Sequence, residues 1–147
     1  YSMSKQQSGF TLIELVVVIV ILGLLAATAL PRFINITGQA RLASLQGVAG
    51  AVRSGAVLAR AQFLVSGSNG GTMSIEGASV TVNTSGYPIA TTGGIDNMVT
   101  GVVGQGYTYD GTSRFIPTNG GVSGSCSVLY TAASGTATVE SGASGCP

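Results

Sequence analysis

Residues 9–31 read GFTLIELVVVIVILGLLAATALP, and this stretch decides how the chain is organised. From Phe10 to Leu30 it contains a single charged residue, Glu14. As an α-helix this segment would be about 31 Å long, enough to cross the hydrocarbon core of a membrane. The residues just before it, 4–9, are polar and carry one positive charge, on Lys5. The sequence therefore predicts a long apolar helix near the N-terminal end.

Three interpretations of this segment compete. A secretory signal would be cut after Ala27-Thr28-Ala29, but the apolar core of such a signal usually has about 7–15 residues, and here it is longer and contains Glu14. A plain membrane anchor has no need of Glu14, because a carboxylate inside a membrane helix costs up to about 3 kcal/mol by insertion scales. The third interpretation gives this carboxylate a role.

Gly9-Phe10-Thr11-Leu12-Ile13-Glu14, set directly against a long apolar run, resembles the processing site of type IV pilins and type II secretion pseudopilins. In that family a membrane peptidase cuts after the glycine and methylates the new N-terminal residue. The resemblance implies cleavage by prepilin peptidase between Gly9 and Phe10, and N-methylation of Phe10. It also implies a leader peptide over residues 1–9, with Met3 as initiator and Tyr1 and Ser2 outside the natural product.

The resemblance also assigns a role to Glu14. An α-amino group is mostly protonated at neutral pH and remains cationic after methylation. Pairing Glu14 of one subunit with the Phe10 amine of its neighbour would neutralise both charges and set the axial register of a filament. Phe10 and Glu14 are therefore the expected assembly residues. Pairing within one chain, four residues back on the same helix, is the alternative and could hold before assembly.

Gly23 and Pro31 match the same family pattern. Proline lacks an N–H donor and clashes with the carbonyl four residues earlier, so we expect Pro31 to break the helix and Gly23 to weaken it. In assembled pili of the family the segment between such residues is often unwound. The alternative is that Pro31 is simply the start of a helix that follows a signal peptide.

Residues 32–65 predict an amphipathic helix after the hydrophobic segment, 10–31. Apolar residues recur every three or four positions and form a stripe that would pack on a globular head. The stripe consists of Leu42, Leu45, Ala49, Val52, Ala56, Ala59 and Phe63. Four glycines weaken this helix, and we expect them to permit close approach of helices in a filament. These are Gly38, Gly47, Gly50 and Gly55.

Residues 66–147 change to a glycine-rich, strand-like pattern and predict a globular β head. Glu76-Gly77 and Asp110-Gly111 are turn signals. The predicted strands are 72–75, 78–83, 105–109, 114–117, 127–132 and 136–140, and residues 95–103 predict a short helix. We expect one small antiparallel sheet packed on the C-terminal half of the long helix, whose apolar half protrudes. This is an α+β layout, the type IV pilin fold.

Cys126 and Cys146 are the two cysteines of the chain. In an exported protein they should be bonded, which stabilises the fold by roughly 3 kcal/mol through loop closure. Two free thiols are the alternative. A bridge at this place resembles the disulfide-bounded C-terminal loop of type IV pilins, whereas pseudopilins generally lack it. Short motifs in the head, at 86–88, 94–95 and 126–131, resemble the mannose-sensitive haemagglutinin branch of type IVa pilins.

The composition argues against catalysis and against nucleic-acid binding. Charged residues make up 7% of the chain and the net charge is +1, so there is no basic footprint for a nucleic acid. The chain has no histidine, which removes Ser-His-Asp and Cys-His catalytic units and histidine metal ligands. We therefore expect no enzyme, no cofactor and no bound metal.

The resemblance implies the major structural subunit of a bacterial type IV pilus. Such a subunit forms a helical homo-oligomer, built at the inner membrane by prepilin peptidase and the assembly machinery and then displayed outside the cell. Adhesion, aggregation, motility or DNA uptake would follow. A pseudopilin or minor pilin of a type II secretion or competence system is the first alternative. A secreted or anchored carbohydrate-binding module, which needs a conventional cut after Ala29, is the second.

Overall fold

A computed structural model describes residues 9–142 and residue 146, and for residues 31–35 it describes the backbone alone. The expected leader, residues 1–9, therefore lies outside the described residues apart from Gly9. The chain divides into two compact units, Tyr1–Ile36 and Thr37–Pro147, and each is described by itself.

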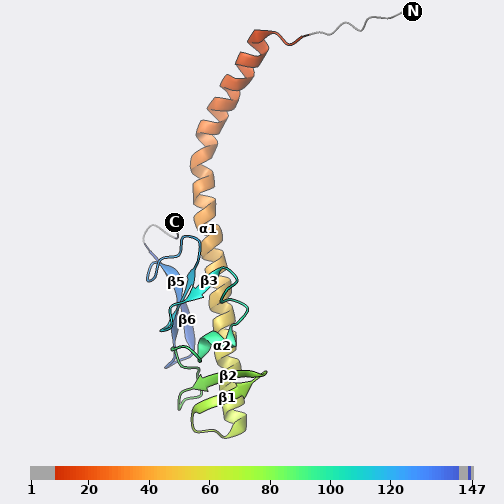
Figure 1. Ribbon diagram of the computed structural model, residues 1–147. Coiled ribbons are helices and arrows are strands. Elements are labelled where there is room, and N and C mark those ends of the chain that lie inside the picture. Colours follow the sequence, from red (N-terminus) through yellow and green to blue (C-terminus); the bar gives the residue numbers. More distant parts are fainter. Residues whose placement is uncertain (1–8, 143–145, 147) are drawn as a thin grey trace, which may run out of the picture. The chain divides into compact units, whose positions relative to one another are not determined.

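Helix α1 covers Leu12–Ser66. Its backbone is helical at both Gly23 and Pro31, and Figure 1 draws the helix as one continuous ribbon. The interruption that we expect between these residues concerns the assembled filament, so it stays a prediction.

The apolar stripe of α1 is buried in the second unit, as its spacing predicts. Leu42 is half-buried, and every other member is at most 9% exposed. Those members are Leu45, Ala49, Val52, Ala56, Ala59 and Phe63. Because their spacing places them on one side of the helix, α1 presents a continuous apolar face to the strands.

The described strands form two antiparallel sheets, not the single sheet that we expected. A hairpin pairs β1 (Gly71–Ile75) with β2 (Ala78–Val82), and a separate sheet holds four strands in the order β3-β4-β5-β6. These strands are Tyr107–Tyr109, Arg114–Pro117, Cys126–Thr131 and Thr136–Ser141. The short helix α2, Ile95–Met98, ends earlier than predicted. The α+β layout is confirmed: the long helix comes first in the chain, and the strands of both sheets come after it (Figure 1).

The returning chain explains why the hairpin stays separate. Thr81 donates its N–H to the carbonyl of Gly93 at 2.8 Å and accepts the N–H of Ile89 at 2.9 Å. Asn83 donates its N–H to the carbonyl of Tyr87 at 2.8 Å. These bonds use the outer edge of β2, so the four-stranded sheet does not continue from it.

The two-residue turn of the hairpin is formed by Glu76 and Gly77, with φ of 51° and 83°. Two positive φ values are typical of a type I′ turn, whose twist matches that of the strands it joins. The register supports this assignment, because Ile75 lies opposite Ala78. The turn predicted from Glu76-Gly77 is confirmed, and it holds the Glu76 side chain out at the tip of the hairpin.

Two apolar clusters stabilise the second unit. The larger one joins α1 to α2 and the four-stranded sheet, and its fully buried residues include Leu45, Val52, Ile95, Phe115 and Val128. The smaller one joins α1 to the hairpin and consists of Ala59, Phe63, Ile75, Val80 and Val82. The helix therefore supplies one side of both clusters.

The four glycines of the C-terminal part of α1 divide into two pairs. A Cβ atom at Gly55 would lie 3.2 Å from the Met98 Cβ, and one at Gly38 would lie 3.0 Å from the Cys146 carbonyl oxygen. A Cβ atom at Gly47 or Gly50 would meet nothing within 4 Å. Gly38 and Gly55 thus allow close packing inside the second unit, and filament packing through Gly47 and Gly50 stays a prediction.

Asp110 stabilises the turn between β3 and β4. Its Oδ1 accepts the N–H groups of Thr112, Ser113 and Arg114 at 2.8, 2.8 and 3.0 Å. Burial raises the pKa of the Asp110 carboxyl, but these N–H donors outweigh that effect and lower the pKa to about 2.

Replacing Asp110 with alanine should lower the free energy of unfolding by about 1 kcal/mol at pH 6, a value reduced for the exposure of the carboxylate. Because the folded pKa is depressed, this stabilisation is present above the unfolded pKa, near 4, and is lost as the pH falls towards 2. Chemical denaturation of both proteins at several pH values would measure it. A difference that stays constant from pH 6 to pH 2 would contradict the role of the charge.

Candidate assembly site and disulfide-bounded loop

The expected processing site is accessible in the structure. Gly9 and Phe10 precede α1 and are exposed, and the Phe10 side chain is 87% exposed. A peptidase could therefore reach the Gly9–Phe10 bond. Cleavage there and methylation of Phe10 remain predictions.

Glu14 and Thr11 form a reciprocal cap at the start of α1. Glu14 Oε2 accepts the Thr11 backbone N–H at 2.9 Å and the Thr11 hydroxyl at 2.7 Å. The Glu14 backbone N–H points back to Thr11 Oγ1 at 3.4 Å. Thr11 immediately precedes the first helical residue, so this is a capping box, in which a Thr and a Glu three residues later satisfy each other's free N–H groups.

Thr11 is a site residue that the sequence reasoning missed. The signal was available, because Thr-x-x-Glu before an apolar run is the sequence pattern of a capping box. The structure therefore gives Glu14 a partner inside its own chain. The pairing of Glu14 with the Phe10 amine of a neighbouring subunit remains a prediction.

The helical segment after this cap is almost entirely apolar and uncovered. Leu12–Leu30 has a mean hydropathy of 2.8, and none of it is buried in the structure. By length and composition it could cross a membrane, as could Ile36–Ser66, with a mean hydropathy of 1.2 and 39% of its best window buried. A fully exposed apolar span needs lipid or other protein around it, because exposing its side chains to water is unfavourable.

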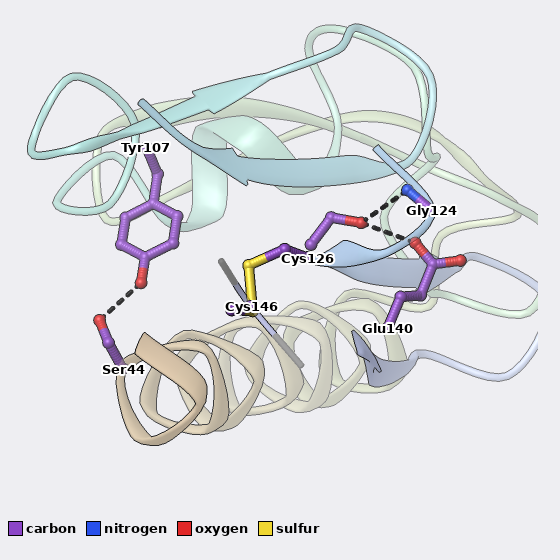
Figure 2. The surroundings of a disulfide bond; sticks show 7 residues. Ser44, Tyr107, Gly124, Cys126, Glu140 and Cys146 are labelled. Atoms are coloured by element: carbon purple, nitrogen blue, oxygen red, sulfur yellow. Dashed lines mark hydrogen bonds between the residues drawn. A yellow bond between two sulfur atoms is a disulfide. The ribbon is translucent and has the colours of Figure 1, made fainter. Parts of the chain in front are cut away.

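Cys126 and Cys146 form a disulfide between positions 20 residues apart, as the sequence led us to expect. Figure 2 shows the bond beside α1, where Cys126 begins β5. The two residues are 0% and 3% exposed. The bridge therefore fixes the C-terminal end of the described chain inside the larger apolar cluster.

A polar network lies on the other face of the sheet, next to the bridge. Arg114 and Glu140 form an ion pair of 2.9 Å. The Ser127 hydroxyl donates to Glu140 at 2.7 Å and accepts the Gly124 N–H at 3.1 Å, and Figure 2 marks both bonds at the labelled residues Glu140 and Gly124. The hydrogen bond from Arg114 lowers the pKa of the Glu140 carboxyl from its ordinary value. The network covers the face of β5 that carries the Ser127 side chain, so Ser127 is buried.

Asp96 and Tyr130 also have structural partners. Asp96 Oδ1 accepts the N–H groups of Gly93 and Gly94, both at 2.9 Å. The Tyr130 hydroxyl donates to the Pro88 carbonyl at 2.9 Å, and burial raises the pKa of Tyr130. Within residues 9–142 and 146 there is no group of three or more His, Cys, Asp or Glu side chains that could hold a metal ion.

Comparison with known proteins finds similarity over part of the chain. Residues 4–30 match the family model of the prokaryotic N-terminal methylation motif. The type IV narrow pilus major component PilA5 of Thermus thermophilus is 54% identical over 54 residues, which is 37% of this chain and 47% of that protein. The type IV major fimbrial protein FimA of Dichelobacter nodosus is 38% identical over 52 residues, 35% of this chain and 33% of that protein.

A secretion protein also matches. The type II secretion system core protein G of Pseudomonas aeruginosa is 51% identical over 43 residues, which is 29% of this chain and 30% of that protein. The chain thus spans less than half the length of each of these relatives. No solved structure shows a significant match to the chain.

Proposed function

We propose that this type IV pilin, identified by its N-terminal methylation motif, its relatives and its α+β layout, is the major structural subunit of a bacterial pilus. The observation that carries the proposal is the uncovered apolar span Leu12–Leu30. Near its start lies the capping-box carboxylate of Glu14, next to the exposed processing site. Proteins of this kind are structural and not enzymes.

In the proposed assembly, prepilin peptidase cuts between Gly9 and Phe10 and methylates Phe10. Before assembly the precursor lies in the inner membrane, where lipid surrounds residues 10–31. The assembly machinery then moves it into a filament, where the same residues of neighbouring subunits cover one another. The Phe10 amine of one subunit then neutralises Glu14 of another, and the helix opens between Gly23 and Pro31.

The second part of α1 supports packing around this core. Within the second unit, the helical residues 37–65 lay one face on the apolar clusters that they share with the strands. The opposite side leaves several large apolar side chains exposed in the described chain. These are Ile36, Val57, Leu58, Leu64 and Val65. Neighbouring helices of a homo-oligomer would cover them, and Gly47 and Gly50 offer close approach.

A pseudopilin of a type II secretion system is the second candidate, because protein G of such a system also matches part of the chain. Two features favour the pilus subunit. The relatives with pilus functions are described as major components, and the head closes its C-terminal loop with Cys126–Cys146. Membership of the mannose-sensitive haemagglutinin branch, and a role in adhesion, aggregation, motility or DNA uptake, are part of the proposal.

Mass spectrometry of filaments sheared from the cell surface would test this function. We expect this chain to be the principal protein of the sheared material, with N-methylated Phe10 as its first residue. A chain that starts at Leu30 would indicate an ordinary secretory signal and overturn the proposal. A chain that is processed at Phe10 but absent from sheared filaments would favour the pseudopilin.

A further inference from the structure

Arg41 lines a surface pocket of about 290 Å³ on the second unit, the Arg41 hollow. The residues that line the hollow are Arg41, Ser44, Gln105, Gly106, Tyr107, Pro117 and Asn119. The Ser44 and Tyr107 hydroxyl groups lie 2.6 Å apart and hydrogen-bond to each other, as Figure 2 shows. The backbone of Gly120 closes on the guanidinium, because a Cβ atom there would lie 2.6 Å from Arg41 Nη1.

Within the described part of the chain, Arg41 makes no hydrogen bond or ion pair, although it is half-buried. The other arginines whose side chains are described all have partners. Arg53 donates to the Ala137 carbonyl, Arg60 donates to the Tyr87 hydroxyl and lies over its ring, and Arg114 pairs with Glu140. A half-buried guanidinium without an acceptor in its own chain can gain a charge-assisted hydrogen bond from an anion that reaches the hollow.

Among the described acidic side chains, Glu76 is the one that makes no hydrogen bond or ion pair. Asp96 and Asp110 accept backbone N–H groups, Glu140 pairs with Arg114, and Glu14 caps α1. Glu76 is exposed at the tip of the β1–β2 hairpin, where the type I′ turn fixes its backbone. The second unit therefore has one unpaired cation and one unpaired anion among its described side chains.

These two charges lie at different levels along α1 and cannot meet within one chain. Ile75, the neighbour of Glu76, packs in the cluster that contains Ala59 and Phe63. These helical residues are 18 and 22 positions beyond Arg41, which corresponds to about 27–33 Å along a helix. A second copy that lies beside the first and is shifted by about this distance along α1 would place the two charges at the same level.

We propose that the Arg41 hollow of one subunit receives the Glu76 carboxylate of another copy of this chain, displaced by about 30 Å along α1. This contact rests on the proposed filament function and specifies which surfaces of the heads meet. It joins two different surfaces of identical subunits, and such a heterologous contact builds an open helical filament when the rotation between subunits does not close a ring. The amides of Gln105 and Asn119 and the hydroxyl pair supply hydrogen bonds to the carboxylate beside the guanidinium.

Charge reversal in the full-length chain tests this pairing. Arg41→Glu and Glu76→Lys should each reduce the yield of sheared filaments about tenfold or more, since each places two like charges together. The double variant Arg41→Glu/Glu76→Lys should recover most of the yield. The cellular level of each variant and the processing at Phe10 should match those of the unchanged protein, which shows that the subunit folds and is processed.

Two further variants make the test specific. Arg41→Glu combined with Ser85→Lys, which adds a lysine at another exposed position of the second unit, should not recover filaments. Recovery by that pair would show that Glu76 is not the partner. Arg41→Cys together with Glu76→Cys should produce disulfide-linked subunits in filaments, whereas each single cysteine variant should not. Filaments that form at normal yield with Arg41→Glu alone would overturn the pairing, while the pilus function itself would stand.

Discussion

Replacing Glu14 with valine or alanine is expected to remove surface filaments while leaving the protein inserted in the membrane. In the filament the Phe10 amine would remain among apolar helices without its carboxylate. Removing one partner of a buried charge pair costs about 3 kcal/mol, or roughly a hundredfold in association. Insertion should persist, because residues 12–30 lose no apolar side chain and the span becomes more hydrophobic. Sheared filament yield and membrane fractionation measure the two effects.

Two control variants separate the charge of Glu14 from its contact with Thr11. Glu14→Gln keeps a side-chain oxygen that can accept the Thr11 N–H, since glutamine also serves in a capping box, but it carries no charge. Thr11→Ala removes the cap, at a cost of about 1 kcal/mol to the helix end, and keeps the charge. We expect Glu14→Gln to fail in assembly and Thr11→Ala to assemble with reduced yield. Normal filaments from Glu14→Gln would show that the cap, and not the charge, is what matters.

Loss of the Cys126–Cys146 bond is expected to have the largest effect on the stability of the second unit. The bond closes a loop over a sequence separation of 20, and the loop-closure entropy that it removes from the unfolded chain corresponds to roughly 3 kcal/mol. Because Cys146 lies against the backbone of α1 at Gly38, its release also frees the C-terminal end from the apolar cluster. Thermal unfolding of the purified chain in detergent should shift by about 10–20 °C.

The control for this prediction is chemical. Adding a reductant to the unchanged protein should give the stability of the Cys126→Ala/Cys146→Ala double variant and should leave that variant unaffected. Limited proteolysis should then cut near the C-terminal end in the reduced protein and in the double variant. Equal resistance to protease in the oxidised and reduced forms would contradict a stabilising role for the bridge.

Local structure was largely predictable because it depends on residues close in sequence. The spacing of Leu45, Ala49, Val52 and their companions predicts a buried helical face, and the structure confirms it. The strand over Arg114–Pro117 has the predicted bounds, and the turns at Glu76-Gly77 and Asp110-Gly111 lie where their residue types predict. Each of these features follows from side-chain period or from the φ values that glycine permits.

Long-range pairing was not predictable in the same way. The single expected sheet is two sheets, because the segment after β2 folds back and occupies its edge through Thr81 and Asn83. The short helix expected over 95–103 stops at Met98. The motif predicts a role for Glu14, and the Thr-x-x-Glu pattern before the apolar run also indicates Thr11 as its local partner.

The sequence by itself determined the apolar span, the processing motif before it, the amphipathic second part of α1 and the approximate positions of the strands along the chain. Those features depend on hydrophobic period and on short motifs, which a sequence displays directly. Only the tertiary structure decided which polar side chains find partners. Arg114 meets Glu140 because β4 and β6 both flank β5, whereas Arg41 and Glu76 are held at different levels along α1 and remain unpaired. Their separation depends on how distant segments pack, and no local pattern records it.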